Sequence, residues 1–197
     1  MLSVHRVKCS VVGEFGVGKT SLISNYLGLA PKSVKATVGV DFFTRACNVL
    51  GHGIQLNLWD TAGTERFQSL TPLYLRDSVI VFVIYDVGSR QVTSDICKWV
   101  TYVDELDIRP FVICVLGNKT DLYETVAPVD VNEALAQFKD KDWHLCTGTA
   151  TVKDNSFERH IKSCLQHVVQ KMQLPHEPVA PILEISVREP SRGTCCT

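Results

Sequence analysis

The chain reads Gly-Glu-Phe-Gly-Val-Gly-Lys-Thr from Gly13 to Thr20, which matches the phosphate-binding pattern G-x-x-x-x-G-K-[ST]. An apolar run at 7–12 precedes this loop and a helix-compatible run at 21–27 follows it, as the pattern requires. The glycines allow backbone N–H groups to converge on one anion, and the start of a helix adds a positive dipole end. Because a strand and a helix flank the loop, we favour a phosphate site over a glycine-rich turn with a solvated lysine.

Two side chains of this loop have expected roles. Lys19 supplies a positive charge for the outer phosphates of a nucleotide, and the Thr20 hydroxyl is a suitable ligand for Mg²⁺. The loop alone therefore predicts a bound nucleotide with Mg²⁺, but it indicates neither the base nor the reaction.

Composition indicates one globular domain and gives no electrostatic reason to expect nucleic acid. The 197 residues are 45% hydrophobic and 21% charged, with a formal net charge of −1. Six of the eight cysteines lie in or beside apolar runs and none are spaced as C-x-x-C, which favours a reducing compartment over a disulfide framework. The start of the chain carries no long apolar segment, and the longest apolar run, 79–85, is too short to cross a bilayer.

Short apolar or alternating runs predict strands, and helical patterns separate them. The expected strands lie at 7–12, 42–49, 54–59, 79–84, 111–116 and 143–146. Apolar residues repeat every three or four positions, which predicts helices, at 92–106, 131–138 and 157–172. Residues 50–53 are expected to join the second and third strands as a hairpin. This order predicts an α/β fold with a doubly wound, six-stranded sheet that is mostly parallel and has one antiparallel edge.

Two further loops leave the carboxyl edge of the expected sheet, where ligands of such folds bind. Asp60 ends the third strand, where a carboxylate can support Mg²⁺ opposite Thr20, and Gly63 lets the backbone approach a terminal phosphate. Asn118-Lys119-Thr120-Asp121 follows the fifth strand. The Asp121 carboxylate can accept hydrogen bonds from the N1–H and exocyclic amine of guanine, a donor pair that adenine lacks. Together with the phosphate loop, these segments predict a guanine nucleotide.

These three segments in this order resemble the Ras superfamily of small GTPases, whose G domain is built on a P-loop. Residues 37–42, Thr-Val-Gly-Val-Asp-Phe, are similar to the first switch of the Rab branch, and residues 59–67, Trp-Asp-Thr-Ala-Gly-Thr-Glu-Arg-Phe, to its second. Tyr74-Leu75-Arg76 is a weaker likeness to that branch's Tyr-Tyr-Arg. The resemblance covers about residues 6–172 and the very C-terminus. It implies a switch that binds and hydrolyses GTP, holds Mg²⁺ with GTP or GDP, and regulates intracellular vesicle traffic.

The resemblance also implies a role for each matching position. Thr37 and Gly63 would sense the γ-phosphate and act with Thr64 in hydrolysis. Thr20 and Thr37 would ligate Mg²⁺ directly and Asp60 through water. The nucleotide would be held by residues of three segments, namely Gly13, Gly16, Val17, Gly18, Lys19, Thr20, Ser21, Asn118, Lys119, Asp121, Thr149, Ala150 and Thr151.

Two of these implications concern the guanine base and the effectors. Thr149-Ala150-Thr151 occupies the place of the family's Ser-Ala-Lys, where the Ala150 N–H would meet the guanine carbonyl. Phe42, Trp59 and Tyr74 stand where the Rab branch has an aromatic triad that contacts effectors. Simple packing of the three rings in the core is the alternative interpretation.

Some positions depart from the family pattern. Thr64 stands where the family has the glutamine that orients the attacking water, and its side chain is too short to reach that water. Phe15 replaces a small residue of the phosphate loop, where a benzyl group would crowd the γ-phosphate and hinder an arginine finger. Ala30 and Pro31 replace a ring that relatives place against the base, and Thr151 replaces the family lysine. We therefore expect slow intrinsic hydrolysis and weaker nucleotide affinity.

The chain is expected to divide into a GTP-binding domain at 1–172 and a flexible tail at 173–197, which contains four prolines and no apolar periodicity. The end, Thr194-Cys195-Cys196-Thr197, resembles the doubly geranylgeranylated ends of Rab proteins; an unmodified pair of thiols is the alternative. The tail has no polybasic segment, so lipid on Cys195 and Cys196 would provide nearly all of the membrane attachment.

The resemblance implies a set of partners and a location. An exchange factor, a GTPase-activating protein, effectors, a prenylation escort and a dissociation inhibitor are expected, and the chain itself is expected to be a monomer. We expect it to be lipid-anchored on the cytoplasmic face of an endomembrane compartment, with a cytosolic pool.

Two other functions stay open at this point. One is a membrane-tethered module that holds GTP almost permanently and has negligible catalysis, which Thr64 and Phe15 favour. The other is a P-loop kinase, which is disfavoured because the segment at 118–121 and the double-cysteine end have no use in such an enzyme. A preference for adenine over guanine would revive the kinase.

A weaker pattern lies near the C-terminal end of the domain. His160, Cys164 and His167 share one face of an expected helix at a spacing that suits metal ligands. No fourth ligand is evident from the sequence, and Cys164 lies beside the apolar stripe. Helix packing is therefore the favoured interpretation.

Overall fold

A computed structural model describes residues 4–29, 37, 39–63, 70–106, 108, 110–123 and 131–173. The expectations for Ala30, Pro31, Thr64, Cys195 and Cys196 lie outside these residues, as does the expected tail from 174 onward.

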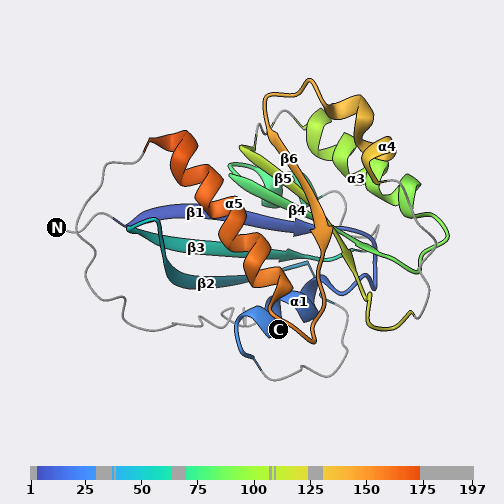
Figure 1. The fold of residues 1–197 in the computed structure, drawn as a ribbon, viewed down its shortest axis with the longest axis horizontal. Coiled ribbons are helices and arrows are strands. Elements are labelled where there is room, and N and C mark those ends of the chain that lie inside the picture. The colour runs from blue at the N-terminus through green and yellow to red at the C-terminus, as the bar shows by residue number, and fades with distance from the viewer. Residues whose placement is uncertain are drawn as a thin grey trace, which may run out of the picture.

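The described strands form one six-stranded sheet with helices on both of its faces (Figure 1). The strands are β1 (His5–Val12), β2 (Val40–Val49), β3 (His52–Thr61), β4 (Ile80–Asp86), β5 (Val112–Asn118) and β6 (His144–Thr149). Their order across the sheet is β2-β3-β1-β4-β5-β6, and every pair is parallel except β2 with β3. The predicted α/β class, with its mostly parallel sheet and one antiparallel edge, is confirmed.

The position of each strand in the sheet follows from its apolar pattern. All seven residues of β5, and the first six of β4, are buried, as expected for central strands covered by helices on both faces. β2 and β6 lie at the two edges of the sheet and mix exposed with half-buried residues.

The hairpin between β2 and β3 is shorter than the predicted connection at 50–53. β2 ends at Val49 and β3 begins at His52, which leaves only Leu50 and Gly51 in the turn. Both turn residues have positive φ, 52° and 84°, as in the two-residue turns whose twist matches that of antiparallel strands. Asn48 stabilises the turn because its Oδ1 accepts a hydrogen bond from the Gly51 N–H at 3.1 Å.

The helices follow the predicted periodic segments, with one addition. They are α1 (Lys19–Tyr26), α2 (Thr71–Leu75), α3 (Val92–Glu105), α4 (Val131–Leu135) and α5 (Ser156–Met172), and a 3₁₀ turn (Ala136–Phe138) extends α4. α2 was not predicted because five residues are too few to show a helical period. None of the described helices is both long and apolar enough to pass through a lipid bilayer.

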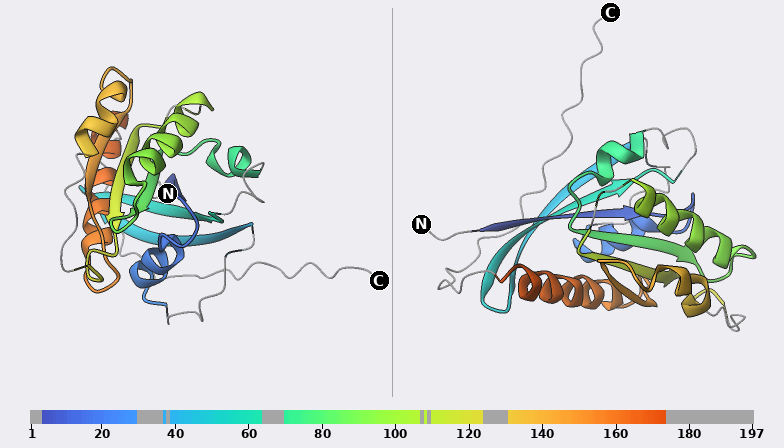
Figure 2. Two further views of the ribbon diagram at one scale, coloured as in Figure 1. Left: turned by 90° about the vertical axis from the view of Figure 1, so that its right-hand side faces the viewer. Right: turned by 90° about the horizontal axis from the view of Figure 1, so that it is seen from above.

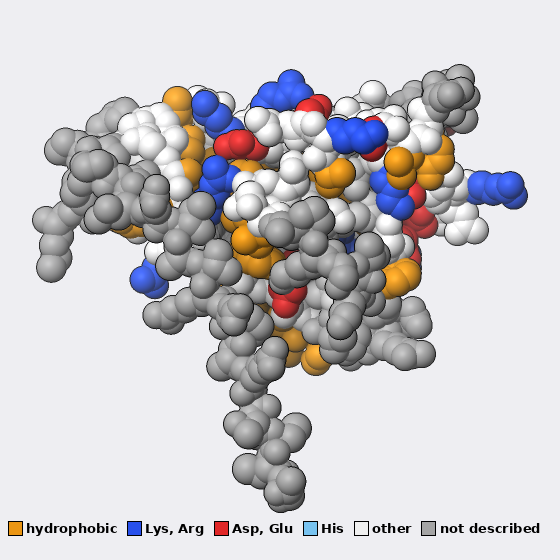
Figure 3. All heavy atoms as spheres, turned by 90° about the horizontal axis from the view of Figure 1, so that it is seen from below, with side chains coloured by type: hydrophobic (Ala, Val, Ile, Leu, Met, Phe, Trp, Pro, Cys, Tyr) orange, Lys and Arg blue, Asp and Glu red, His pale blue; other side chains and the backbone are white. Residues whose placement is uncertain are grey.

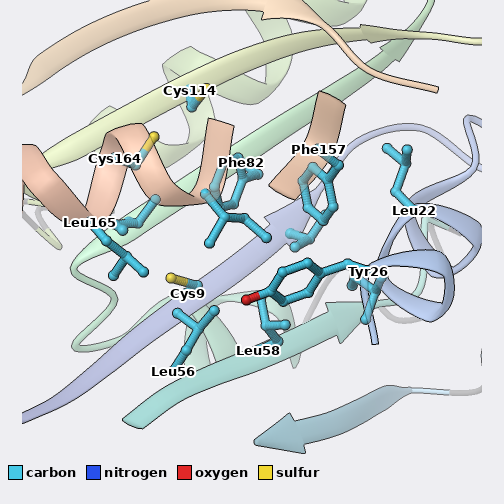
Figure 4. Packing of buried hydrophobic residues seen from close by; sticks show 14 of the residues in the cluster. Cys9, Leu22, Tyr26, Leu56, Leu58, Phe82, Cys114, Phe157, Cys164 and Leu165 are labelled. Carbon is cyan, nitrogen blue, oxygen red and sulfur yellow. The ribbon is translucent and has the colours of Figure 1, made fainter. Parts of the chain in front are cut away.

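Two hydrophobic cores lie on opposite faces of the sheet. α1 and α5 cover one face, where the rings of Phe82 and Phe157 pack edge to face at 5.3 Å (Figure 4). α3, with α2 and α4, covers the other face, where Ile96, Trp99 and Val103 are buried. Figure 2 shows α5 on one side of the sheet and α3 on the other. Helices therefore cover both faces of the sheet, and the loops at its carboxyl edge are free to form a binding site.

The described surface has no large area of one charge on the face that Figure 3 shows. Basic, acidic and apolar side chains alternate there over short distances. This mixture agrees with the formal net charge of −1 for the whole chain.

Candidate functional site

Hydrogen bonds join the ends of β1 and β3, and the end of β5 with the phosphate loop, at the carboxyl edge of the sheet. The Thr61 hydroxyl at the end of β3 donates to the carbonyl of Val11 in β1 at 2.8 Å. The side-chain amide of Asn118, at the end of β5, donates to the Val17 carbonyl in the phosphate loop at 2.7 Å. The segments that the sequence predicts to act together are therefore held together by direct contacts.

The phosphate loop is packed too closely for side chains at some of its positions. A Cβ atom at Gly13, whose φ is +143°, would lie 2.1 Å from the Ile84 carbonyl oxygen. Gly18 caps the start of α1, and its carbonyl accepts a hydrogen bond from the Leu22 N–H at 3.0 Å. The backbone thus wraps tightly around the helix start, where N–H groups and the helix dipole favour an anion.

Lys19 lies inside this loop and is only 6% exposed. Its Nζ donates to the carbonyls of Gly13 and Glu14, both at 2.9 Å. Burial lowers the pKa of Lys19 to about 8, and the nearby carboxylates of Asp60 and Glu14 oppose that shift. A Cβ atom at Gly63 would lie 2.5 Å from this Nζ, so the backbone of the loop after β3 passes close to the ammonium group. The group is therefore buried, charged at neutral pH and placed between the loops that follow β1 and β3.

The expected Mg²⁺ ligands lie together at the same edge. The hydroxyl oxygens of Thr20 and Thr37 are 2.9 Å apart, although 17 positions separate them in the chain. Asp60, the residue before the last of β3, is fully buried, and its negative charge acts on Lys19. Hydroxyl and carboxylate oxygens are the ligands that Mg²⁺ prefers, so these residues fit the ion. When bound, Mg²⁺ would neutralise charge on the outer phosphates.

Asp121, expected to select guanine, is held by two neighbours. Its Oδ1 accepts a hydrogen bond from the Thr151 hydroxyl at 3.1 Å, and the Lys153 Nζ lies 3.0 Å from its Oδ2. The hydrogen bond from Lys153 is the largest of the influences that lower the pKa of Asp121. Sequence reasoning missed Lys153, because it stands two positions after Thr151, the place where the family pattern has its lysine.

The other members of the predicted guanine loop make contacts within the protein. Lys119 has a φ of 67°, and its Nζ forms an ion pair with Asp86 Oδ2 at 2.7 Å. The Ala150 N–H donates to the Gly117 carbonyl at 2.8 Å, so a contact with a base requires this bond to be shared or exchanged. The Asn118 side chain donates to the Val17 carbonyl and thereby links the guanine loop with the phosphate loop.

The three aromatic residues predicted for effectors form one continuous group. The ring centroids of Phe42 and Trp59 are 5.0 Å apart, and those of Trp59 and Tyr74 are 6.1 Å apart. Phe42 is 37% exposed, and Leu73, which precedes Tyr74 in α2, is 64% exposed. The rings come from β2, β3 and α2, and Phe42 is exposed whereas Trp59 and Tyr74 are half-buried.

A comparison of the chain with protein-family models identifies the family to which this arrangement belongs. The model of the Ras family matches residues 8–172, which include every strand but the start of β1 and every described helix. The chain belongs to the Ras family. Members of this family are small GTPases that bind GTP or GDP, typically with Mg²⁺, and work as switches with exchange factors, activating proteins and effectors. Both the fold and the general activity follow from this membership.

The structure gives the surroundings of two phosphate-loop residues of this Ras-family chain that its sequence could not reveal. One carboxylate oxygen of Glu14 accepts from the Lys98 ammonium at 2.5 Å and from the Trp99 indole N–H at 2.9 Å, which ties the loop to α3. Phe15 is 63% exposed, so its ring lies on the surface and not in the core. No sequence pattern marks the Glu14 contact, because its two partners stand more than 80 positions away.

Proposed function

We propose that this Ras-family chain is a Rab-type switch that regulates intracellular vesicle traffic by GTP-dependent binding of effectors at a membrane. The observation that carries the proposal is the contiguous, partly exposed group of Phe42, Trp59 and Tyr74. The group borders both segments that resemble Rab switches, so a change in those segments would alter the surface that the rings present. The resemblance of residues 37–42 and 59–67 to Rab switches supports the same assignment.

The rings provide a direct test of effector recognition. We expect Trp59→Ala to abolish the capture of partners that bind the GTP-loaded protein and not the GDP-loaded protein. Because Trp59 also packs against the Lys8 ammonium at 4.5 Å, GDP content and the melting temperature must be measured on the same sample. A Trp59→Ala variant that is folded, loaded with GTP and still captures the same partners would overturn the assignment of the rings.

The proposal includes slow intrinsic hydrolysis. Thr64 has no amide group to orient a water molecule, and the phosphate loop carries the exposed Phe15 ring where relatives have a small residue. The slow rate is proposed for hydrolysis without an activating protein. Some Rab-activating proteins resemble enzymes that supply the missing glutamine themselves, so stimulated hydrolysis is compatible with Thr64. Slow turnover would prolong the GTP-bound state until such a partner arrives.

Single-turnover hydrolysis tests this part. We expect Thr64→Gln to hydrolyse bound GTP faster than the natural chain, and the dissociation rate of GDP serves as the control for intact binding. Equal or faster turnover in the natural protein contradicts the proposal.

Membrane attachment through Cys195 and Cys196 and an endomembrane location belong to the same proposal. The sequence support is the terminal Cys-Cys-Thr, since two lipid chains give stable anchoring where one does not. Mass spectrometry of natively expressed protein is expected to find two geranylgeranyl groups. An unmodified mass in the membrane fraction would contradict this attachment.

A membrane-tethered module that holds GTP without meaningful catalysis is the second candidate, and Thr64 with Phe15 favours it. Nucleotide analysis directly after purification separates the two candidates. A switch retains mainly GDP, whereas the module retains mainly GTP and shows no measurable single-turnover rate.

A further inference from the structure

Three cysteine thiols meet in the core beneath α5. Cys114 and Cys146 are paired positions on β5 and β6, and both pack in the core that α5 covers. Cys164 comes from α5, and Figure 4 shows its thiol directed toward Cys114. The three sulfur atoms all lie within 4.8 Å of one another, and those of Cys146 and Cys164 are 3.8 Å apart.

These separations match those of sulfur ligands around one metal ion. Two sulfurs bound to a tetrahedral zinc ion at about 2.3 Å lie about 3.8 Å apart, and in a trigonal arrangement they lie about 4.0 Å apart. An ion can therefore sit among the three sulfurs with side-chain adjustments alone. Two thiols closing into a disulfide would have to approach from 3.8 Å to about 2.05 Å and would leave the third thiol unused.

The three thiols differ in burial, which provides a route for an ion. Cys114 and Cys164 are buried, whereas Cys146 lies half-buried on the edge strand β6. Around Cys146, His144 and His167 stack with ring centroids 4.1 Å apart, and His160 contacts the Thr149 carbonyl. The exposed side of the cluster thus carries imidazoles, which are themselves metal ligands.

The donor set favours a thiophilic cation. The three sulfur atoms lie within 4.8 Å of one another, and two of the three cysteines are buried. A bound cation would supply the charge that lets the thiols ionise, and their protons would leave to solvent.

We propose that Cys114, Cys146 and Cys164 form a binding site for a thiophilic metal ion, Zn(II) or Cu(I). Three sulfurs complete the coordination of Cu(I), whereas Zn(II) would add water or a nearby imidazole on the side of Cys146. The ion would join β5, β6 and α5, and β6 leads directly into the loop at 149–151. The site is independent of the proposed function.

The test is metal binding to the full chain in a Cys195→Ser, Cys196→Ser background, which removes the terminal thiol pair. The protein is kept saturated with GDP and Mg²⁺ under a non-thiol reductant, and Zn(II) and Cu(I) are titrated separately against chromophoric competitors. We expect one equivalent of ion to bind, with release of about two or three protons. Cys146→Ser should weaken binding at least tenfold. Loss of a residue that only supports a metal ligand already lowers metal affinity by about tenfold or more, so loss of a ligand should cost at least as much.

Cys97→Ser is the matched control, because Cys97 is also half-buried but lies on α3, where its thiol bonds the Ala134 carbonyl at 3.4 Å. Its binding should equal that of the parent. The absence of binding for both ions, or an equal loss in Cys97→Ser and Cys146→Ser, would overturn the site. Retained GDP identifies the folded variants.

A second measurement needs no cysteine substitution in the cluster. X-ray absorption of the metal-loaded parent should show about three sulfur neighbours at about 2.3 Å. A first shell of nitrogen and oxygen alone would refute the site. Metal should also raise the melting temperature of the parent, since a ligand of the folded state stabilises it.

Discussion

Lys19 shows how burial prepares a single residue for its partner. Its ammonium lies inside the phosphate loop, bonded to two carbonyls, and desolvation lowers its pKa to about 8. An anion beside it would favour the charged form and raise that pKa, so binding of phosphate is coupled to retention of the Lys19 proton.

From this we predict that nucleotide affinity falls as pH rises through about 8. Above that pH the free protein loses the Lys19 proton, and binding must take it up again, so affinity should fall by up to about tenfold per pH unit. Measured dissociation constants for GDP between pH 7 and 9.5 test this. Lys19→Arg controls for the titration of guanine itself, because a guanidinium keeps its charge throughout. Parallel pH profiles for the two proteins would contradict the prediction.

Thr151 provides a second prediction at the scale of one residue. Its hydroxyl donates to Asp121 Oδ1 at 3.1 Å, so Thr151→Val should remove one orienting bond from the carboxylate and keep the shape of the side chain. A loss of about 1 kcal/mol, or about fivefold faster GDP dissociation, is expected. Thr147→Val is the matched control, since Thr147 is exposed on β6 and is not among the residues expected to hold the nucleotide. Equal effects of the two substitutions would argue against this role of Thr151.

At the scale of elements, two hydrogen bonds of Glu14 connect the phosphate loop with α3. Glu14 accepts hydrogen bonds from Lys98 and from Trp99, whose side chain is 5% exposed. The pair with Lys98 is partly solvated and contributes little, whereas the Trp99 indole N–H needs an acceptor in the core. The carboxylate thus couples the position of the loop to a helix of the opposite layer.

Replacement of Glu14 tests this coupling. Glu14→Ala should leave the Trp99 N–H unsatisfied and lower the free energy of unfolding by about 1–3 kcal/mol. Glu14→Gln keeps an acceptor for Trp99 and removes only the charge, so it should lose less than about 1 kcal/mol. Urea unfolding of the GDP-bound proteins, followed by tryptophan fluorescence, gives both values. An equal loss in the two variants would show that the charge, and not the indole bond, is what matters.

For the whole molecule, the nucleotide site is assembled from segments that the sheet order brings together. Thr20 follows β1, Thr37 precedes β2, and Asp60 lies near the end of β3, so an ion bound by all three would link separate parts of the chain. Binding at such a site stabilises the folded state as a whole and not one element.

Removal of Mg²⁺ should therefore lower the melting temperature of the GDP-bound protein and speed GDP loss. In Asp60→Asn, which keeps the side-chain size and removes the charge, we expect a weaker dependence on Mg²⁺, by about tenfold in the concentration needed. Thermal unfolding across a magnesium titration measures both effects. An unchanged titration midpoint in Asp60→Asn would exclude Asp60 from the support of the ion.

The sequence alone determined the class of the fold and the three segments that identify the family. The apolar runs of β4 and β5 and the periodic repeats of α3 and α5 are local patterns, and the phosphate loop is a contiguous segment whose spacing is fixed by its ligand. The sequence could not reveal α2, because five residues show no helical period. It also could not reveal the two-residue turn after Val49, because turn length depends on strand register.

Only the tertiary structure decided which distant side chains meet. Lys153 reaches Asp121, Glu14 reaches Trp99, and three cysteines from two strands and a helix come within 4.8 Å of one another. Each contact depends on strand order and on the face of the sheet toward which a residue points. Those choices are fixed by the burial of whole elements against one another, and no short stretch of sequence encodes them.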